Sequence, residues 1–89
     1  MKAIVTVVGK DRVGIIASVC TKLAQYNVNV MDISQTVMQG YFTMMMVVEV
    51  STCNVPLSEL VTGMEQLGRE MGLSIRVQRE DIFEAMHRI

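Results

Sequence analysis

The sequence of 89 residues is poor in the side chains that catalysis and metal binding most often use. It contains one histidine, His87, two cysteines and no tryptophan. A histidine-based nucleophilic site needs the nucleophile beside that histidine, and nothing in the pattern places one there. Cys20 and Cys53 lie far apart without a CxxC motif, which speaks against a zinc ribbon or a redox pair. We therefore expect no catalytic residue, no metal ligand and no cofactor.

A surplus of positive charge is also missing. Eight lysines and arginines stand against nine acidic residues, so the formal net charge is −1. Binding to nucleic acid would lack its main driving force, and four aromatic side chains are too few for an RNA-stacking sheet. No apolar run is long enough to span a bilayer, and the run after Lys2 has no cleavage site. With two free thiols, the chain is expected in the cytoplasm, without a nucleic-acid or membrane partner.

Apolar residues are abundant, at 51% of the chain. A chain of this length forms one domain and buries a core with little margin. So high an apolar fraction in so small a protein indicates a second apolar surface besides the core. We therefore expect a homodimer or a larger homo-oligomer.

The spacing of the apolar residues predicts the order βαββαβ followed by a short helix. Strands are expected at 2–8, 28–38, 41–50 and 73–78, and helices at 16–26, 56–71 and 81–89. Gln39-Gly40 is a hairpin signal. Right-handed crossovers place both long helices on one face of a four-stranded antiparallel sheet. The expected fold class is therefore α+β, a ferredoxin-like sandwich with the first and third strands in the centre.

Several details depend on the phase of the apolar pattern. The first strand is apolar at nearly every position, so both of its faces should be covered. The first helix should bury Ile16, and the second strand should carry Val30 on one face and Ile33 on the other. The chain divides into a domain of residues 1–80 and a helical tail of residues 81–89. The tail is too short to be stable alone and should dock through Ile82, Phe83, Met86 and Ile89.

The turn between the first strand and the first helix is the best candidate for a site. Glycines at both ends, Gly9 and Gly14, permit a tight turn and close approach to the backbone. The amides of the helix start lack intrahelical partners, and Asp11 is a suitable cap for them. The positive end of the helix dipole favours an anionic group, either Asp11 itself or the carboxylate of a small ligand. The turn is not a phosphate loop, because Ile15-Ile16 follows instead of Lys-Ser/Thr.

Three segments carry a resemblance to a known family. G-K-D-R-V-G-I-I at residues 9–16, followed by N-V-N-V-M-D-I-S-Q at residues 27–35, resembles an ACT domain. With the tail D-I-F-E-A-M-H-R-I at residues 81–89, the whole chain resembles the stand-alone ACT proteins of the UPF0237 family. Its front half is similar to the ACT domains of the glycine-cleavage repressor and of formyltetrahydrofolate deformylase. Val13 replaces the proline that this turn commonly has in the family.

The resemblance implies a regulatory module that senses a small molecule. ACT domains commonly pair and bind amino acids or related metabolites at the interface, between the first turn and the second strand. Asp11 would accept from an α-ammonium group, and Asn29 would supply an amide. No enzyme domain follows in this chain, so the output would pass through a partner protein. The residues that the resemblance assigns to the ligand are Gly9, Lys10, Asp11, Arg12, Val13, Gly14, Ile15, Asn29 and Asp32.

Two other functions are compatible with the pattern. The chain could be an interaction module whose ligand site has decayed. It could also be a small hydrolase of the acylphosphatase type, which shares the order of elements. That enzyme needs an arginine in the first turn and an asparagine on the second strand, and Arg12 and Asn29 meet the need loosely.

Overall fold

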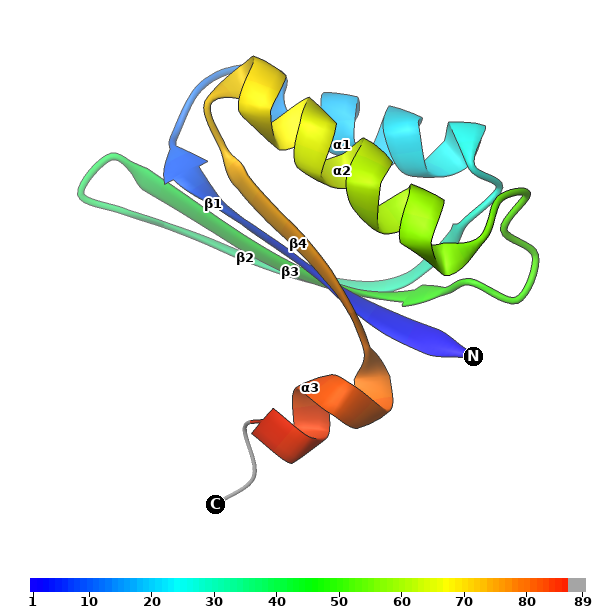
Figure 1. Cartoon of the computed structure of the whole chain (residues 1–89). Helices are drawn as coiled ribbons and strands as arrows, with labels where there is room; N and C mark the ends of the chain where they lie inside the picture. The colour runs from blue at the N-terminus through cyan, green and yellow to red at the C-terminus, as the bar shows by residue number, and fades with distance from the viewer. Residues whose placement is uncertain (87–89) are drawn as a thin grey trace.

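A computed structural model describes residues 1–86 of the chain. Seven elements follow one another, and Figure 1 shows them in two main layers with a short helix apart. The strands are β1 (Lys2–Lys10), β2 (Asn29–Met38), β3 (Tyr41–Glu49) and β4 (Ser74–Arg79). The helices are α1 (Ile15–Gln25), α2 (Leu57–Met71) and α3 (Glu80–Met86).

The four strands form one antiparallel sheet in the order β2-β3-β1-β4. Helices α1 and α2 cover one face, whereas α3 lies on the other side (Figure 1). We call these the helix face and the outer face. The predicted ferredoxin-like α+β fold is confirmed, with β1 and β3 in the centre and β2 and β4 at the edges.

The core lies between the helix face and the two long helices. On β3, every second side chain from Phe42 to Val48 points into it and is at most 3% exposed. The alternation begins directly after the hairpin, where Gln39 and Gly40 have φ values of 55° and 80°. Two successive positive φ values belong to the tight turn that matches the twist of antiparallel strands. This turn fixes which face of β3 enters the core.

Two predictions about which side chains face the core are wrong. Helix α1 begins at Ile15, which is buried, whereas Ile16 is 38% exposed. Ile15 lies four residues before the buried Val19 and therefore shares its side of the helix, whereas Ile16 is turned away by roughly 100°. In β2, a bulge between Val30 and Asp32 shifts the register. Val30 and Ile33 therefore share the helix face, although strict alternation would separate them.

The covering of the outer face is incomplete, so the prediction for β1 holds only at one end. Ile4 is 6% exposed there, but Val8 is 43% exposed. Of the predicted docking stripe on the tail, Phe83 is half-buried while Ile82 and Met86 remain exposed. Ile89 and His87 lie outside the described residues, and the division at residue 80 stays a prediction.

None of the helices between residues 1 and 86 combines the length and the apolar content needed to cross a membrane.

Candidate functional site

The turn after β1 is held in place at both ends. The Asp11 amide donates to the Gly40 carbonyl across 2.9 Å, which ties the turn to the β2–β3 hairpin. Gly14 has φ +95° and precedes α1 directly. A Cβ there would meet no atom within 4 Å, so glycine is required for its backbone conformation and not for space. The turn is therefore a fixed platform at the start of α1.

The expectation that Asp11 caps α1 is wrong. Gly14 occupies the N-cap position, and no side chain of the described residues makes a capping hydrogen bond there. Asp11 lies three residues before that position, too early in the chain for the usual cap, which bonds the second or third amide of the helix. The first amides of a helix have no acceptor within the helix. At α1 they face the turn without a protein carboxylate to receive them.

A pocket of about 270 Å³ opens between this turn, the start of α1 and the hairpin strands. Ile15 and Phe42 form its buried apolar floor, at 2% and 3% exposed. Asp11, Arg12 and Gln35 supply the polar groups. Its volume lies just below the usual range for drug-sized ligands, so the pocket suits a molecule with few heavy atoms. The lining residues are Asp11, Arg12, Gly14, Ile15, Ile16, Ala17, Gln35, Val37 and Phe42.

The two charged side chains of the pocket have no ionic partner. The ion pairs among residues 1–86 are Met1–Glu49 and Arg79–Asp81, and neither involves Asp11 or Arg12. Both turn residues are exposed. A carboxylate and a guanidinium at one opening can pair with an ammonium group and an anion, respectively. The helix amides add a second place for an anion.

The structure divides the nine residues expected at the ligand. Asp11, Arg12, Gly14 and Ile15 line the turn pocket, and Gly9 and Lys10 end the strand that leads into it. Val13 points fully into solvent, at 101% exposed, and does not line the pocket.

Asn29 and Asp32 do not lie at the turn. Asn29 pairs with Glu49, at the end of the sheet opposite the hairpin. Gln35 lies six positions further along the strand, which corresponds to roughly 20 Å. Asp32 lies on the outer face, where its carboxylate accepts from the Ile33 amide across 2.9 Å. In one copy of the chain, the expected ligand residues of the turn and those of early β2 therefore do not form one site.

Topology explains this separation. Strands β1 and β2 both run antiparallel to β3, so they run in the same direction. The C-terminal end of β1 is then level with the C-terminal part of β2. Gln35 and Val37, which the sequence analysis did not select, occupy that level and line the pocket. The strand directions and the predicted hairpin contained the signal that could have found them.

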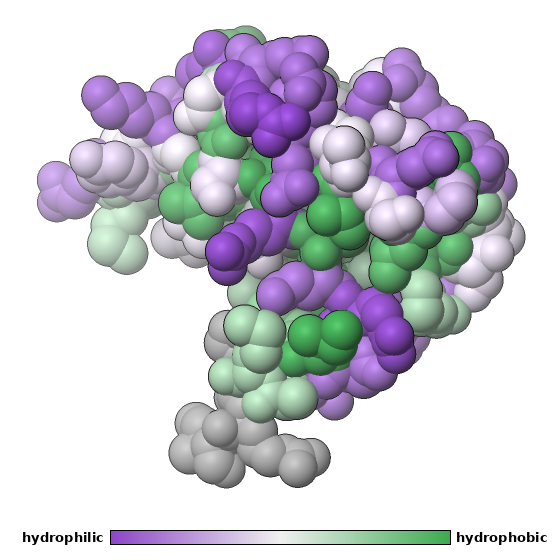
Figure 2. All heavy atoms as spheres, viewed as in Figure 1, coloured by the Kyte–Doolittle hydropathy of each residue, from purple (hydrophilic) through white to green (hydrophobic). Residues whose placement is uncertain are grey.

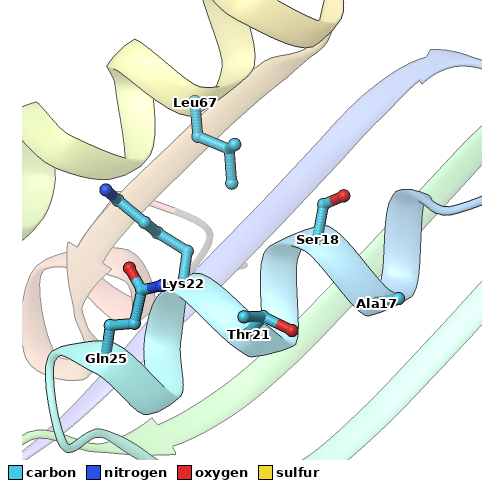
Figure 3. A pocket seen from close by; sticks show the side chains of 6 residues that line it. All are labelled: Ala17, Ser18, Thr21, Lys22, Gln25 and Leu67. Carbon is cyan, nitrogen blue, oxygen red and sulfur yellow. The ribbon is translucent and has the colours of Figure 1, made fainter.

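A second hollow, of about 420 Å³, lies between α1 and α2. Figure 3 shows Leu67 of α2 pointing toward α1, while Lys22 and Gln25 of α1 reach toward α2. The Lys22 ammonium lies 5.5 Å from the centre of the Tyr26 ring. The polar side chains that line this hollow belong to the solvent-exposed side of α1. Lys22 is the one charged residue among them, and the hollow does not include the start of a helix, as the turn pocket does. We therefore take the turn pocket as the candidate site.

A metal site and the acylphosphatase alternative each require particular side chains to come together. No three histidine, cysteine or acidic side chains of residues 1–86 come together as a metal site. Cys20 and Cys53 are free thiols and half-buried. Arg12 and Asn29, on which the acylphosphatase alternative depends, lie at opposite ends of the sheet. One copy of the chain does not bring them to a common substrate.

The fold and the turn are those of an ACT domain, whose family model matches residues 2–78. Domains of this kind are commonly ligand-binding regulatory modules. A UPF0237 protein of Bifidobacterium longum is 57% identical over 88 residues, which cover 99% of this chain and 98% of the relative. The chain therefore belongs to the UPF0237 family of ACT-domain proteins.

Two solved structures agree with this assignment. An ACT domain protein from Streptococcus pneumoniae is 47% identical, with a TM-score of 0.82 and 98% of each chain covered. A formyltetrahydrofolate deformylase from Pseudomonas syringae is 23% identical, with a TM-score of 0.80 over 88% of this chain and 27% of that one. The second likeness shows the fold alone.

Proposed function

We propose that the chain is a cytoplasmic sensor that binds an amino-acid-like metabolite in the turn pocket. One observation carries this proposal: Asp11, Arg12 and the uncapped start of α1 surround one small pocket with an apolar floor. An amino acid presents an ammonium group, a carboxylate and a small side chain. Asp11 binds the ammonium, Arg12 and the amides bind the carboxylate, and the floor receives the side chain.

The proposed module acts as a homo-oligomer whose output passes to a partner protein. Edge strand β2 supports the proposed homo-oligomer, since nine of its ten residues are exposed. An unprotected edge presents unpaired amides and carbonyls to another strand. Ile16, Ile33 and Val37 are 38%, 42% and 54% exposed, and two of them line the pocket. A second copy on this edge would cover them and close the pocket.

Asn29 distinguishes a site within one copy from a site shared by two. Antiparallel pairing of β2 with a second β2 would bring the Asn29 end of one strand to the level of the partner's turn. Asn29 reaches a ligand only through such a pairing. In the proposed shared site, Asn29→Ala therefore weakens binding, although the residue lies roughly 20 Å from the pocket of its own copy.

The test is a thermal-shift screen of amino acids and of pterin and folate compounds, followed by calorimetric titration. A ligand raises the melting temperature according to its concentration relative to its dissociation constant. Asp11→Asn removes one charge and no helix cap, so its melting temperature should stay near that of the wild type. Its affinity should fall by roughly 10- to 100-fold, the value of a charge-assisted hydrogen bond. Glu65→Gln, on the exposed side of α2, is the matched control.

Two results would overturn the proposal. One is that no compound in the screen shifts the melting temperature, which favours an interaction module without a ligand. The other is that Asp11→Asn and Arg12→Gln both bind a confirmed ligand as tightly as the wild type. The ligand would then occupy another surface. The groove between α1 and α2 would be the next to test, with Lys22→Gln.

A further inference from the structure

The outer face of the sheet has one covered half and one open half. Helix α3 contacts β1 and β4 at the end where the chain begins, and the Gln78 amide lies 3.4 Å from the Met86 sulfur. Ile4, paired with Gln78, is 6% exposed. Four residues further along β1, Val8 is 43% exposed. The cover therefore ends within the length of one strand.

The open half carries an apolar surface beside the hairpin. Met38 and Tyr41, paired with each other next to the turn, are 66% and 57% exposed. A shallow hollow of about 540 Å³ lies at this place. With Val8 on the neighbouring strand, this is a larger apolar area than isolated surface residues make. We call it the hairpin patch; it consists of Val8, Thr36, Met38, Tyr41 and Thr43.

Helix α3 has an apolar side that its own sheet covers only in part. Ile82 and Met86 are 46% and 61% exposed, and they are four residues apart, on one side of the helix. Apolar atoms of α3 face outward at the lower end of the molecule in Figure 2. Seven residues are too few for a helix that is stable without packing. A further apolar contact through the exposed parts of Ile82 and Met86 would stabilise it.

The charges of the two surfaces are opposite. Helix α3 contains Glu80, Asp81 and Glu84, and Asp81 already pairs with Arg79 at one end. Lys10 pairs with Tyr41 in the sheet and stands at the border of the hairpin patch. Arg76 lies on the same face, opposite Thr6. An acidic helix on a patch with a basic border is electrostatically favourable and restricts its orientation.

We propose that α3 of a second copy packs on the hairpin patch. The covered half and the patch lie at opposite ends of one face. Because α3 lies over β1 and β4 and the patch lies mainly on β2 and β3, the two are also on opposite sides of the sheet. A two-fold axis that runs diagonally to the strands, between two facing sheets, therefore brings each α3 onto the other copy's patch. The two helices then lie in one layer between the sheets, with Phe83 toward its own sheet and Ile82 toward the partner. Met86 lies between the two sheets, since its sulfur contacts Gln78 of its own sheet and 61% of the residue is exposed. Such an interface repeats the same contact twice, as a closed dimer requires.

The hairpin patch includes Thr36 and Met38 of β2, but it uses the outer face of that strand, whereas strand pairing would use the backbone along its edge. The turn pocket is lined by other residues. The inference goes beyond the proposed function and does not depend on a ligand. It assigns a role to the segment after residue 78, where the match to the ACT family model ends. A stable interface needs well over about 1,000 Å² of buried surface in total. The facing sheets and both helices supply more surface than α3 alone.

The test is a disulfide cross-link between two different chains. One chain carries Met86→Cys and the other, marked by a larger affinity tag, carries Met38→Cys; Cys20 and Cys53 are replaced by alanine in both. After mixing and mild oxidation, the expected product is a mixed dimer of the two chains. A pair with Met86→Cys and Thr62→Cys, on the exposed side of α2, is the matched control and should give little product. The melting temperature of the alanine background, compared with that of the wild type, shows whether the replacements have changed the fold.

Charge reversal provides a second measurement. Lys10→Glu and Glu84→Lys should each weaken self-association by several-fold in sedimentation experiments at low salt, and the double variant should recover part of the loss. Lys22→Glu should leave it unchanged. The proposal is overturned if the 86–38 pair gives no more product than the control pair. It is also overturned if the charge reversals act additively, without recovery in the double variant.

Discussion

The two faces of the sheet are built from one set of strands but have different surroundings. On β3 the methionines Met44 and Met46 point into the core and are fully buried, while Met45 between them points outward and is 42% exposed. Three identical side chains in succession thus occupy two environments. The difference shows that strand position, and not hydrophobicity, decides which residue stabilises the domain and which remains available for contacts.

The helix face is also the more tightly constrained of the two. Gly68 of α2 is buried, and a Cβ at this position would lie 2.7 Å from the Leu73 carbonyl oxygen. On the outer face, Val8, Tyr41 and Met45 are 43%, 57% and 42% exposed. On the helix face, adding or removing one methyl group should therefore lower the stability. On the outer face, even truncation of a whole side chain should change the stability little.

The largest expected effect is a comparison of Met46→Ala with Met45→Ala. Met46→Ala leaves a cavity in a closed core and should lower the free energy of unfolding by about 2–5 kcal/mol. Met45→Ala removes the same atoms from the outer face and should cost less than about 1 kcal/mol. Urea unfolding of both variants at one protein concentration measures the difference. Equal losses would mean that the outer face is covered as fully as the helix face.

A smaller effect is expected for Gly68→Ala. Alanine is better than glycine in a helix by about 1 kcal/mol, but its Cβ would push α2 away from the backbone of β4. Overpacking of this kind costs about 1–3 kcal/mol, so we expect a net loss of stability. Thr62→Ala, on the exposed side of the same helix, should instead raise stability slightly. A stabilising Gly68→Ala would show that the contact between α2 and β4 can relax freely.

The sequence predicted the parts of this molecule that local chemistry determines. The order of the elements, the Gln39-Gly40 turn and the end of the second long helix at residue 71, before Gly72 with φ 70°, were all predicted from the chain. The exposure of Ile16 and the bulge before Asp32 were not, because each depends on where a neighbouring element fixes the phase. One residue of shift exchanges buried and exposed positions.

The residues of the candidate site also fall into a group that could be predicted from local sequence and a group that could not. The glycines and charges of the turn were visible, since a turn is local. Asp11 as a cap was wrong because the helix begins after Gly14, three residues later than a cap at Asp11 would require. Asn29 was separated from the turn by strand direction, which is a property of the whole sheet. Gln35 and Val37 entered the pocket for the same reason.

The smallest expected effect concerns the polar end of the outer face. The Glu49 carboxylate accepts from the Met1 ammonium group across 2.8 Å and from the Ser51 hydroxyl across 2.8 Å. The hydrogen bond from the ammonium is the main cause that lowers the pKa of Glu49 from 4.5 to about 2, and the bond from Ser51 is the second. The contact thus joins the start of the chain to the end of β3.

A lowered pKa in the folded state stabilises the protein when the carboxylate is ionised. The contribution of Glu49 is therefore complete above pH 4.5 and is lost as the pH falls from 4.5 toward 2. Glu49→Gln should remove this part of the acid dependence, so that its stability falls less than that of the wild type between pH 5 and pH 2. Urea unfolding across that range, with a free amino terminus and with Glu65→Gln as control, measures the difference. Identical pH slopes for wild type and Glu49→Gln would mean that solvent screens this contact and that it does not contribute to stability.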